Sequence, residues 1–511
     1  MSFFHTAPSQ LSQFDTLRSK LRRVKTFTCA KEAVDYVKEL YDESVQTITR
    51  GFVNAVKGEQ ENIEGLSQAT YPYVALDIQN NGVSLDARLA YGVAREPGVY
   101  GVTLTRPDLF GYYYEEQLRL LMHRHEAEVI VGLSDWSIPL PYVVDQLVTG
   151  DELTTGEKSL SAHSGFALPS LTHIDDTVAN GTYVPPAGHP KPLSLFDAER
   201  VDFSLNRLHH YTGTAPEHFQ GFILLTNYQR YIDEFITYSK EQLKQSEDYK
   251  SEDYEALIGP GDTVIASRDS LDLDQPYETP KSLPQMPAYH LKRRDGSGIT
   301  FINIGVGPSN AKTITDHLAV LRPHCWLMLG HCAGLRSTQL LGDYVLAHGY
   351  VRDDHVLDQD LPLWIPVPPI AEVQLAMQHA AETISDLHGL DIKSRLRTGT
   401  LVTTDNRNWE LRSKEMYERF LQSRAIAVDM ESATVAANGF RFRVPYGTLL
   451  CVSDKPIHGE LKLRGMASTF YRQRVSQHLK VGLETIEILR RQGADQLHSR
   501  KLRGFDEPPF R

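Results

Sequence analysis

The stretch AIAVDMESATVAANGFRFRVPYGTLLCVSD (residues 425–454) decides the fold, because it joins two apolar runs through a segment with a helical pattern. The runs at 425–429 and 446–453 are short and aliphatic, as strands buried on both faces are. The helix between them is expected to end at Gly439, since glycine favours the left-handed position that follows a helix. A strand, a helix and a second strand in this order predict an α/β fold with parallel pairing.

The same alternation extends back to Ile299. Four further apolar runs have the composition of buried strands: ITFINIG (299–305), HCWLMLG (324–330), GDYVLAH (342–348) and GTLVTT (399–404). Helical patterns accompany them at 309–321, 371–384 and 468–491. We therefore expect a three-layer α/β/α domain whose central sheet is mixed and largely parallel.

The N-terminal half has a different pattern. The 511 residues of the chain exceed one ordinary hydrophobic core, so two domains are expected. Residues 28–57 repeat apolar residues at helical spacing, and residues 71–105 are typical of short strands with Asn-Gly and Pro-Gly turns. This half is therefore predicted to be an α+β domain.

The boundary between the domains is expected in the stretch at about 172–195, which is rich in Pro, Gly and Thr and typical of a linker. The first domain then covers residues 1–190 and the second covers residues 201–511. Residues 239–285 are charged and poor in large aliphatic side chains, so we expect them to form a mobile insertion.

The composition excludes several classes of protein. A net charge of −12 argues against a nucleic-acid partner, because binding to the phosphate backbone needs a clustered excess of Lys and Arg. Cys29, Cys325, Cys332 and Cys451 show no disulfide-like or metal-binding spacing, which suits a reducing compartment. The sequence shows no secretory signal and no apolar run long enough to cross a membrane, so we expect a cytoplasmic protein.

Met430 and Glu431 follow the first strand of the opening stretch. Ligands of parallel sheets gather beyond the carboxyl ends of the strands. A carboxylate there can accept hydrogen bonds from two vicinal hydroxyls, and a methionine can lie against the apolar face of a sugar. The alternative is that Glu431 only complements the positive end of the following helix dipole.

Ser453 and Asp454 end the second strand. At such a position an aspartate can be a general acid, a helix N-cap or a metal ligand. The metal interpretation is the weakest, because no further acidic or histidine ligand stands at a useful spacing. The clusters HRHE (123–126) and RDDHVLDQD (352–360) also lack a metal-binding spacing, so solvated charge is the better interpretation and no metal site is expected.

Four motifs occur in a characteristic order: IGVGPSNA (304–311), LGHCAGL (329–335), DMES (429–432) and the strand that ends in VSD (452–454). Together they resemble the nucleoside phosphorylase and nucleosidase superfamily. Over nearly the whole chain the sequence is similar to the AMP nucleosidases of that superfamily. The most specific stretches lie at 201–222, 305–323, 396–412 and 441–463.

This resemblance implies an enzyme that hydrolyses the N-glycosidic bond of AMP to adenine and ribose 5-phosphate. Asp454 would protonate purine N7, and Glu431 and Met430 would hold the ribose, with Ser453 beside them. The chemistry agrees, because cleavage leaves negative charge on the base and positive charge on the sugar. An aspartate in water titrates near pH 3.9, so a dry environment or the bond to N7 would have to retain its proton.

One departure from the phosphorylases concerns the attacking group. The arginine that phosphorylases carry before the second glycine-rich turn falls on Met328, and the serine or threonine after that glycine falls on His331. Without the arginine the site is less suited to inorganic phosphate as nucleophile. Water is therefore the expected attacking group.

The 5′-phosphate of AMP also needs a binding site, and Arg230 is the first candidate because it matches a phosphate-binding arginine. The other candidates are His331, Ser309, Asn310, Arg407 and His210, the last donated by a neighbouring subunit. Surface solvation for Arg407 and a turn or core position for His331 and Ser309 stay open as alternatives. Trp409 is a candidate for stacking on adenine, with ordinary packing as its alternative.

The resemblance further implies an N-terminal regulatory domain, activation by Mg-ATP, inhibition by phosphate, a homohexamer and no cofactor for catalysis. AMP is the expected small-molecule partner, and neither nucleic acid nor membrane is expected to bind. Two other functions stay open. One is a phosphorylase or nucleosidase acting on unphosphorylated nucleosides, and the other is a nucleotide sensor without catalysis.

Overall fold

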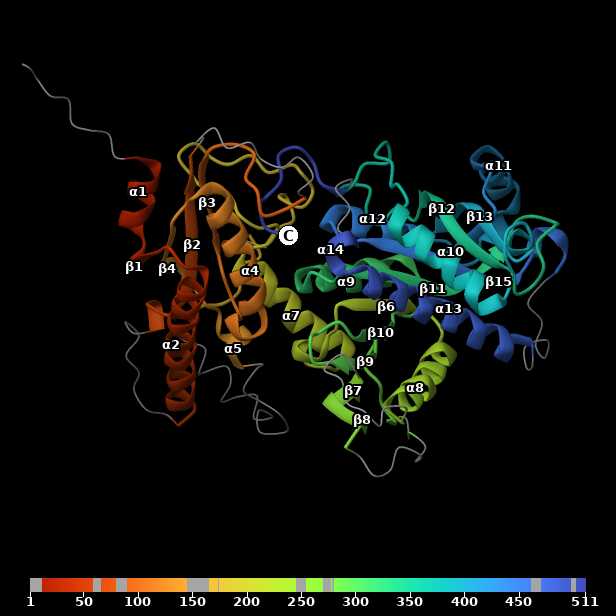
Figure 1. The fold of residues 1–511 in the computed structure, drawn as a ribbon, viewed down its shortest axis with the longest axis horizontal. Helices are drawn as coiled ribbons and strands as arrows, with labels where there is room; N and C mark the ends of the chain where they lie inside the picture. Colours follow the sequence, from red (N-terminus) through yellow and green to blue (C-terminus); the bar gives the residue numbers. More distant parts are fainter. Residues whose placement is uncertain are drawn as a thin grey trace, which may run out of the picture. The chain divides into compact units, whose positions relative to one another are not determined.

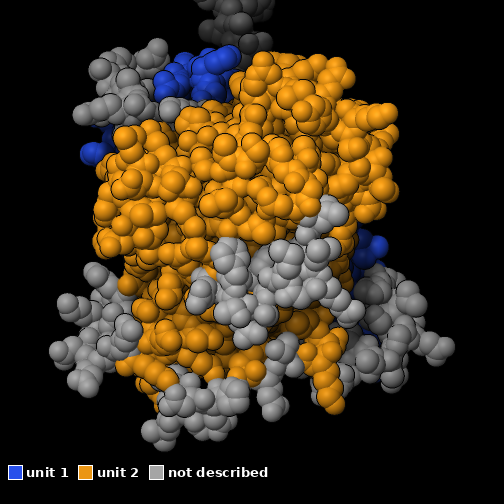
Figure 2. Space-filling model, turned by 90° about the vertical axis from the view of Figure 1, so that its right-hand side faces the viewer, with its two compact units in different colours: residues 1–206, 503–511 blue, residues 207–502 orange. Residues whose placement is uncertain are grey.

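The computed structural model describes residues 12–57, 66–79, 90–144, 165–172, 174–244, 254–269, 277, 280–460, 470–497 and 502–511. The chain forms two compact units, shown in different colours in Figure 2. Unit 1 comprises Met1–Asn206 together with Arg503–Arg511, and unit 2 comprises Arg207–Leu502. Each unit contains a sheet of its own.

A five-stranded sheet with the order β1-β4-β2-β3-β5 forms the centre of unit 1 (Figure 1). Its elements are β1 (Arg22–Phe27), β2 (Thr70–Ile78), β3 (Gly98–Thr103), β4 (Val129–Ser137), β5 (Lys191–Pro192), α1 (Gln13–Lys20), α2 (Ala30–Lys57), α4 (Pro107–His125) and α5 (Leu140–Val144). Helix α2 packs on β2, β4 and α4. Its apolar face is buried, because Val37, Leu40 and Ile48 recur at helical spacing and are at most 2% exposed. The helix expected at 28–57 is thus present.

Residues 503–511 belong to unit 1, which differs from the expected second domain. The side chain of Phe510 is 1% exposed, and its N–H donates a hydrogen bond of 3.0 Å to the carbonyl of Leu193. The hydroxyl of Tyr113 in helix α4 donates to the carbonyl of Arg511 at 2.9 Å. Buried contacts therefore hold these residues to unit 1, a tertiary effect that no local pattern signals.

The stretch at 172–195 is not a linker, although its composition suggested one. Strand β5 within it pairs with β3, and Leu193 and Leu195 are buried. The division between the units falls inside helix α7 (Ala198–Thr212) instead. Burial of Leu193 and Leu195 stabilises this stretch within unit 1, although most residues around them favour turns.

A ten-stranded sheet forms the centre of unit 2, with the order β14-β13-β12-β15-β11-β6-β10-β9-β7-β8. Its strands are β6 (Phe222–Thr226), β7 (Tyr254–Gly259), β8 (Thr263–Ser267), β9 (Ala288–Arg293), β10 (Ile299–Asn303), β11 (Cys325–Gly334), β12 (Tyr344–Asp353), β13 (Leu396–Thr404), β14 (Ala427–Asp429) and β15 (Tyr446–Asp454). The six strands expected after residue 299 are all present. The expected α/β class is confirmed, but the sheet is not largely parallel, because antiparallel pairings within the described residues are as frequent as parallel ones.

An additional pairing between β14 and β11 closes five strands into a ring. The helices of unit 2 are α8 (Gln229–Lys244), α9 (Pro308–Leu318), α10 (Ala371–Ser385), α11 (Ser413–Ser423), α12 (Ser432–Phe442), α13 (Phe470–Gln492) and α14 (Ala494–Leu497). Helices α10 and α13 pack against each other and against β15, in front of the strands in Figure 1. None of the described helices combines the length and the apolar composition of a membrane span.

The insertion expected at 239–285 is corrected where the structure describes it. Residues 254–259 and 263–267 are strands β7 and β8, which extend the sheet beyond β9. Leu257 and Ile258 are buried there, so two aliphatic side chains suffice to anchor the segment. Residues 245–253, 270–276, 278 and 279 lie outside the described residues.

Helices α9 and α12 pack side by side through a buried polar network. Asp316 of α9 accepts hydrogen bonds from Asn438 at 2.8 Å and from Arg441 at 3.3 Å, both on α12. Helix α12 continues past Gly439, and Arg443 adopts the left-handed conformation in its place. A Cβ at Gly439 would lie 2.4 Å from the ring of Tyr446, so close packing is what requires this glycine. The network joins the C-terminal parts of the two helices.

Candidate active site

Strand β11 is the element around which the candidate catalytic residues gather. Ala333 of β11 pairs with Asp454 at the end of the parallel strand β15. On its other side, Ala333 pairs with Val428 of β14. Because β14 runs antiparallel to β11, the chain that follows it carries Glu431 back along β11. Asp454 and Glu431 therefore come from two strands that pair with the same end of β11.

The carboxylate of Glu431 is held at both oxygens. The N–H of Gly307 donates to Oε1 at 2.7 Å, and Nδ2 of Asn227 donates to Oε2 at 3.0 Å. Gly307 has a φ of 115°, a conformation that a residue with a side chain adopts only under strain. Asn227 directly follows β6, and its Oδ1 lies 3.3 Å from where a Cβ on Gly330 would be. Two loops and one strand thus meet at this carboxylate.

Burial raises the pKa of Glu431 above its usual range, because its side chain is almost completely removed from water. The nearby carboxyl of Asp429 raises the pKa of Glu431 further through charge repulsion. The hydrogen bonds from Gly307 and Asn227 oppose both effects, since they stabilise the ionised form. Further donors, such as two sugar hydroxyls, would favour ionisation of Glu431 in the same way.

Asp429, and not Glu431, accepts hydrogen bonds at the N-terminus of α12, where the sequence left open that Glu431 complements the helix dipole. Oδ2 of Asp429 accepts from the N–H of Ser432 at 2.9 Å, in the first turn of α12, and also from the Ser432 hydroxyl. Its Oδ1 accepts from the hydroxyl of Thr403 at 2.5 Å. Glu431 makes no capping hydrogen bond at this helix. Its carboxylate is therefore directed toward the loops after β6 and β10.

Asp454 is half-buried at the end of β15. The hydroxyl of Ser453 lies 2.6 Å from Asp454 Oδ1 and 3.3 Å from the carbonyl oxygen of Cys332 in β11. Ser453 thereby holds the carboxyl of Asp454 beside the end of β11. Asp454 is not the N-cap of an α-helix, because β15 leads into the short turn Pro456–His458. The capping alternative therefore does not describe it.

Arg230, Ser309 and Asn310 lie on neighbouring strand-to-helix connections. Arg230 is half-buried in the first turn of α8, and the other two are in the first turn of α9. The two connections are joined, because Nδ2 of Asn303 at the end of β10 donates to Gln229 Oε1 at 3.2 Å. The first turn of a helix carries unpaired N–H groups and a partial positive charge. The arrangement is suited to binding an anionic group.

His331 belongs to a buried hydrogen-bond chain rather than to an exposed binding surface. Burial lowers the pKa of His478 to about 3, so this ring is neutral near pH 7. Its Nε2 donates to the carbonyl of Leu449 at 3.0 Å, which leaves Nδ1 to accept from the hydroxyl of Tyr231 at 2.6 Å. The Tyr231 oxygen then accepts from Nε2 of His331 at 3.3 Å. Nε2 of His331 is thus a donor within this buried chain.

Two other positions are packed in the interior. Met328 is completely buried within β11, between Leu225 of β6 and Thr448 of β15 in register. Trp409 is 7% exposed in an apolar cluster, and its ring meets that of Phe420 at 5.5 Å, edge to face. The packing alternative therefore describes Trp409, and the expected stacking on adenine is corrected. Met328 provides no positive charge where phosphorylases carry an arginine.

Arg407 and His210 are not brought to the residues around β11. Arg407 is exposed in the loop after β13. His210 is exposed near the end of α7, and its ring contacts that of Tyr211 at 5.1 Å. Within the described residues, no hydrogen bond joins either side chain to Glu431 or Asp454. A role for His210 in a neighbouring subunit's site stays a prediction.

Sequence reasoning missed Asn227 and the capping role of Asp429. Asn227 follows an apolar run, a position where a polar side chain at a strand end could have drawn attention. Asp429 stands in the DMES motif, and its spacing to Ser432 is a capping signal. No group of three or more His, Cys, Asp or Glu side chains gathers as a metal site within the described parts of the chain.

The chain is similar to known proteins over nearly its whole length. Residues 32–190 match the family described as the N-terminus of bacterial AMP nucleoside phosphorylase, and residues 258–487 match the phosphorylase superfamily. The AMP nucleosidase of Escherichia coli (strain K12) is 50% identical over 492 residues, which are 94% of this chain and 98% of that protein. A guanosine phosphorylase of Halorubrum lacusprofundi is 24% identical over 168 residues, covering 33% of this chain and 66% of its own. The crystal structure of an AMP nucleosidase from Bacteroides thetaiotaomicron is similar over 57% of this chain and 98% of its own, with 27% identity and a TM-score of 0.41.

Proposed function

Because this chain belongs to the AMP nucleosidase family, we propose that it hydrolyses the N-glycosidic bond of AMP and releases adenine and ribose 5-phosphate. The observation that carries the residue assignment is the Glu431 carboxylate. It is buried, held at both oxygens by Gly307 and Asn227, and placed by β14 beside the strand that also pairs with Asp454. The pairing of β14 and β15 with the same end of β11 supports the proposal that Glu431 and Asp454 act in one site.

Asp454 is proposed as the acid that protonates N7 of adenine. The C1′–N9 bond breaks with both electrons moving to the base, so a proton on N7 makes the base a better leaving group. Ser453 supports this role, because its hydroxyl holds one oxygen of the Asp454 carboxyl against β11. The second oxygen is then the one proposed to meet the purine.

Glu431 and Met430 are proposed to hold the ribose. The vicinal hydroxyls of the sugar would donate to the Glu431 carboxylate, whose two fixed donors set its orientation before substrate binds. Asn227 is a positioning residue in this scheme, since it acts on the sugar through Glu431. Met430 is half-buried beside Glu431 and is available for apolar contact with the sugar ring.

Water is the proposed nucleophile. It adds to C1′ as the C1′–N9 bond breaks, loses a proton to solvent, and leaves ribose 5-phosphate, while Asp454 regains its proton from solvent. Met328 supports hydrolysis over phosphorolysis, because this buried thioether cannot bind inorganic phosphate as an arginine does. The reaction balances as AMP and water giving adenine and ribose 5-phosphate.

Arg230, Ser309 and Asn310 are the proposed ligands of the 5′-phosphate. The hydrogen bond from Asn303 to Gln229 joins the two strand-to-helix connections that carry these residues. All three residues lie in the first turn of a helix, where binding of an anion is favoured. His331 is a weaker candidate, since its ring is buried against Tyr228 and Tyr231. Arg407, and His210 from a neighbouring subunit, stay as proposals without support from contacts within this chain.

The test is to incubate the full-length protein with AMP in phosphate-free buffer and to follow adenine and ribose 5-phosphate by chromatography. We expect both products in equal amounts, and no more than a trace with the Asp454→Asn variant. Absence of adenine with and without Mg-ATP would contradict the proposed function. Adding inorganic phosphate distinguishes the phosphorylase alternative, which would give ribose 1,5-bisphosphate. Equal turnover of adenosine would indicate a nucleosidase without a phosphate site.

Activation by Mg-ATP, inhibition by inorganic phosphate, assembly as a homohexamer and a cytoplasmic location are further proposals, supported by family membership alone. Light scattering of the full-length protein tests the hexamer. Initial rates with Mg-ATP and with phosphate, each varied separately at fixed AMP, test the two effectors. Cell fractionation tests the location.

A further inference from the structure

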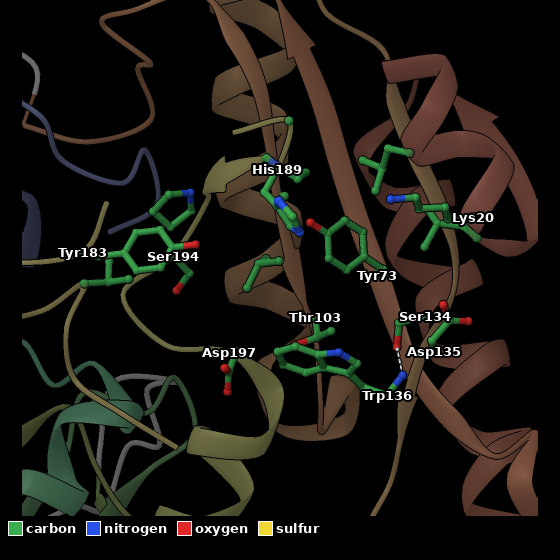
Figure 3. Close-up of a pocket in the computed structure, with 18 of the residues that line it drawn as sticks. Lys20, Tyr73, Thr103, Ser134, Asp135, Trp136, Tyr183, His189, Ser194 and Asp197 are labelled. Carbon is green, nitrogen blue, oxygen red and sulfur yellow. Dashed lines mark hydrogen bonds between the residues drawn. The ribbon is translucent and has the colours of Figure 1, made fainter. Parts of the chain in front are cut away.

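Unit 1 contains a cavity of about 580 Å³, a size typical of small-molecule sites. Its wall is formed by β2, β3 and β4, by helix α1 and by the segment between residues 172 and 197 (Figure 3). The candidate catalytic residues described above all belong to unit 2. This cavity is therefore a site separate from the proposed active site.

Tyr73 of β2 crosses the floor of the cavity. Gly101 in β3 makes this possible, because a Cβ there would lie 2.3 Å from the Tyr73 hydroxyl. Burial raises the pKa of the Tyr73 hydroxyl, and the nearby Tyr183 raises it further. The hydroxyl therefore stays protonated, and Tyr73 presents a neutral ring to the cavity.

Two further aromatic side chains line this cavity while exposed to solvent. Trp136 at the end of β4 is 41% exposed, and Tyr183 is 39% exposed. Figure 3 shows Trp136, Tyr73 and Tyr183 around the same space. Aromatic rings exposed in a cavity offer a stacking surface, and each base stacked on such a ring adds ~1–3 kcal/mol to binding in single-stranded nucleic-acid sites. A planar ring is the ligand shape that fits.

The charges of the lining residues favour a ligand without a negative charge. Asp135, Asp175 and Asp197 line the cavity, whereas Lys20 and His189 are the basic side chains among its lining residues. Asp175 and Asp197 are partly engaged, the former with the N–H of Thr177 at 2.8 Å and the latter with that of Arg200 at 2.8 Å. Carboxylates accept hydrogen bonds and repel phosphate groups.

Asp197 also links the cavity to helix α7. By accepting from the N–H of Arg200 it caps this helix, which continues as far as Thr212 in unit 2. A ligand donor that competes for Asp197 would change the cap of a helix shared by both units.

We propose that this cavity binds a planar nitrogen heterocycle that carries N–H donors and no phosphate, a free purine base being the class that fits. Its ring stacks on Trp136, and an N–H group donates to the carboxylate of Asp197. The site is distinct from the substrate site of unit 2. Its existence does not depend on the proposed function.

Equilibrium dialysis of the full-length protein with labelled adenine tests this proposal. We expect two sites per chain, one in the cavity and one at the product position of unit 2. Trp136→Ala should weaken the cavity site roughly 5- to 150-fold, the range that corresponds to the stacking energy, and leave one site. Trp364→Ala is the matched control, because Trp364 is 81% exposed in unit 2 and does not line the cavity. It should retain both sites.

Charge variants test the chemistry of the ligand. Asp197→Asn should weaken the Trp136-dependent site roughly tenfold, as expected for a hydrogen bond to a charged group, while its amide oxygen can still accept from the N–H of Arg200. Lys20→Ala should leave adenine binding within about twofold. Loss of adenine binding in Lys20→Ala, or competition by inorganic phosphate or Mg-ATP at the Trp136-dependent site, would mark an anion site and overturn the proposal.

The outcome is separable from that of the proposed function. Trp136→Ala should hydrolyse AMP at the rate of the unaltered protein when adenine is absent, and a thermal unfolding profile that matches the unaltered protein shows that its unit 1 folds. If the number of adenine sites does not change in Trp136→Ala, the cavity proposal fails while AMP hydrolysis is unaffected. If the protein does not hydrolyse AMP, the Trp136-dependent site should still be present.

Discussion

Nδ2 of Asn227 donates a hydrogen bond of 3.0 Å to Oε2 of Glu431, across more than two hundred residues of sequence. The N–H of Gly307 holds the other oxygen at 2.7 Å. The carboxylate is therefore fixed at both oxygens before any sugar arrives. Such preorganisation lowers the cost of orienting the ribose in the transition state.

The variant Asn227→Asp should shift the pH dependence of the reaction. It replaces a donor by a second carboxylate, and repulsion raises the pKa of Glu431, which burial and Asp429 already raise. Ionised Glu431 then appears only at higher pH, so the acidic limb of kcat/KM for AMP should move upward by roughly one unit. Asn227→Ala removes the donor without adding charge and should move the limb less. If the acidic limb of the pH profile is unchanged in both variants, Asn227 does not act on Glu431.

The variant Asp454→Asn should lower kcat for AMP by roughly 10²–10⁴-fold, the usual contribution of a positioned general acid. The control is the 5-phosphate of 4-nitrophenyl riboside, whose leaving group needs no proton. Steady-state rates on this compound should fall much less. An equal loss on both compounds would assign Asp454 to binding or folding instead of proton transfer.

Replacing Trp409 should affect stability and leave substrate affinity unchanged. Its ring packs against Phe420 in an apolar cluster, so Trp409→Ala should lower the free energy of unfolding by ~3–5 kcal/mol. Trp409→Phe should restore part of this loss. Denaturant unfolding and KM for AMP measure the two effects. A large rise in KM for Trp409→Phe without a loss of stability would support stacking on adenine.

Asp202 should make the stability of unit 1 depend on pH. It is buried and accepts from Tyr71 and Thr105, each at 2.7 Å, and burial raises its pKa to about 7. The folded state then binds a proton that the unfolded state releases near pH 4, so stability decreases as pH rises from about 4 to 7. This group contributes a decrease on the order of 4 kcal/mol. In Asp202→Asn, the free energy of unfolding should vary less with pH over that range. If its slope against pH is the same in both proteins, Asp202 is not the cause of the pH dependence.

Local sequence patterns were sufficient for strands β10 to β15 and helices α9, α10, α12 and α13 of unit 2. Short aliphatic runs separated by amphipathic segments predicted strands from β10 to β15, since burial on both faces leaves a clear signature. In helix α13, Val475, Leu479, Leu483 and Ile486 are each at most 3% exposed. Order along the chain also placed Glu431 and Asp454 at strand ends.

Contacts between residues far apart in the sequence decide the features that local patterns did not predict. DMES contains two carboxylates, and only the contacts with Thr403, Gly307 and Asn227 show which one caps a helix and which one faces the site. The stretch at 172–195 has the composition of a linker, yet it lines the cavity of unit 1. Such outcomes depend on which distant surfaces meet, and no local propensity encodes this.

Residues 503–511 complete unit 1 although they follow the whole of unit 2 in the chain. During translation, an N-terminal domain can ordinarily fold as soon as it leaves the ribosome. Here the place of Phe510 beside Leu193 stays empty until nearly three hundred further residues have been added. The first unit to be synthesised is therefore completed after the second, and a nascent chain that stalls within unit 2 carries an N-terminal unit whose core is unfinished.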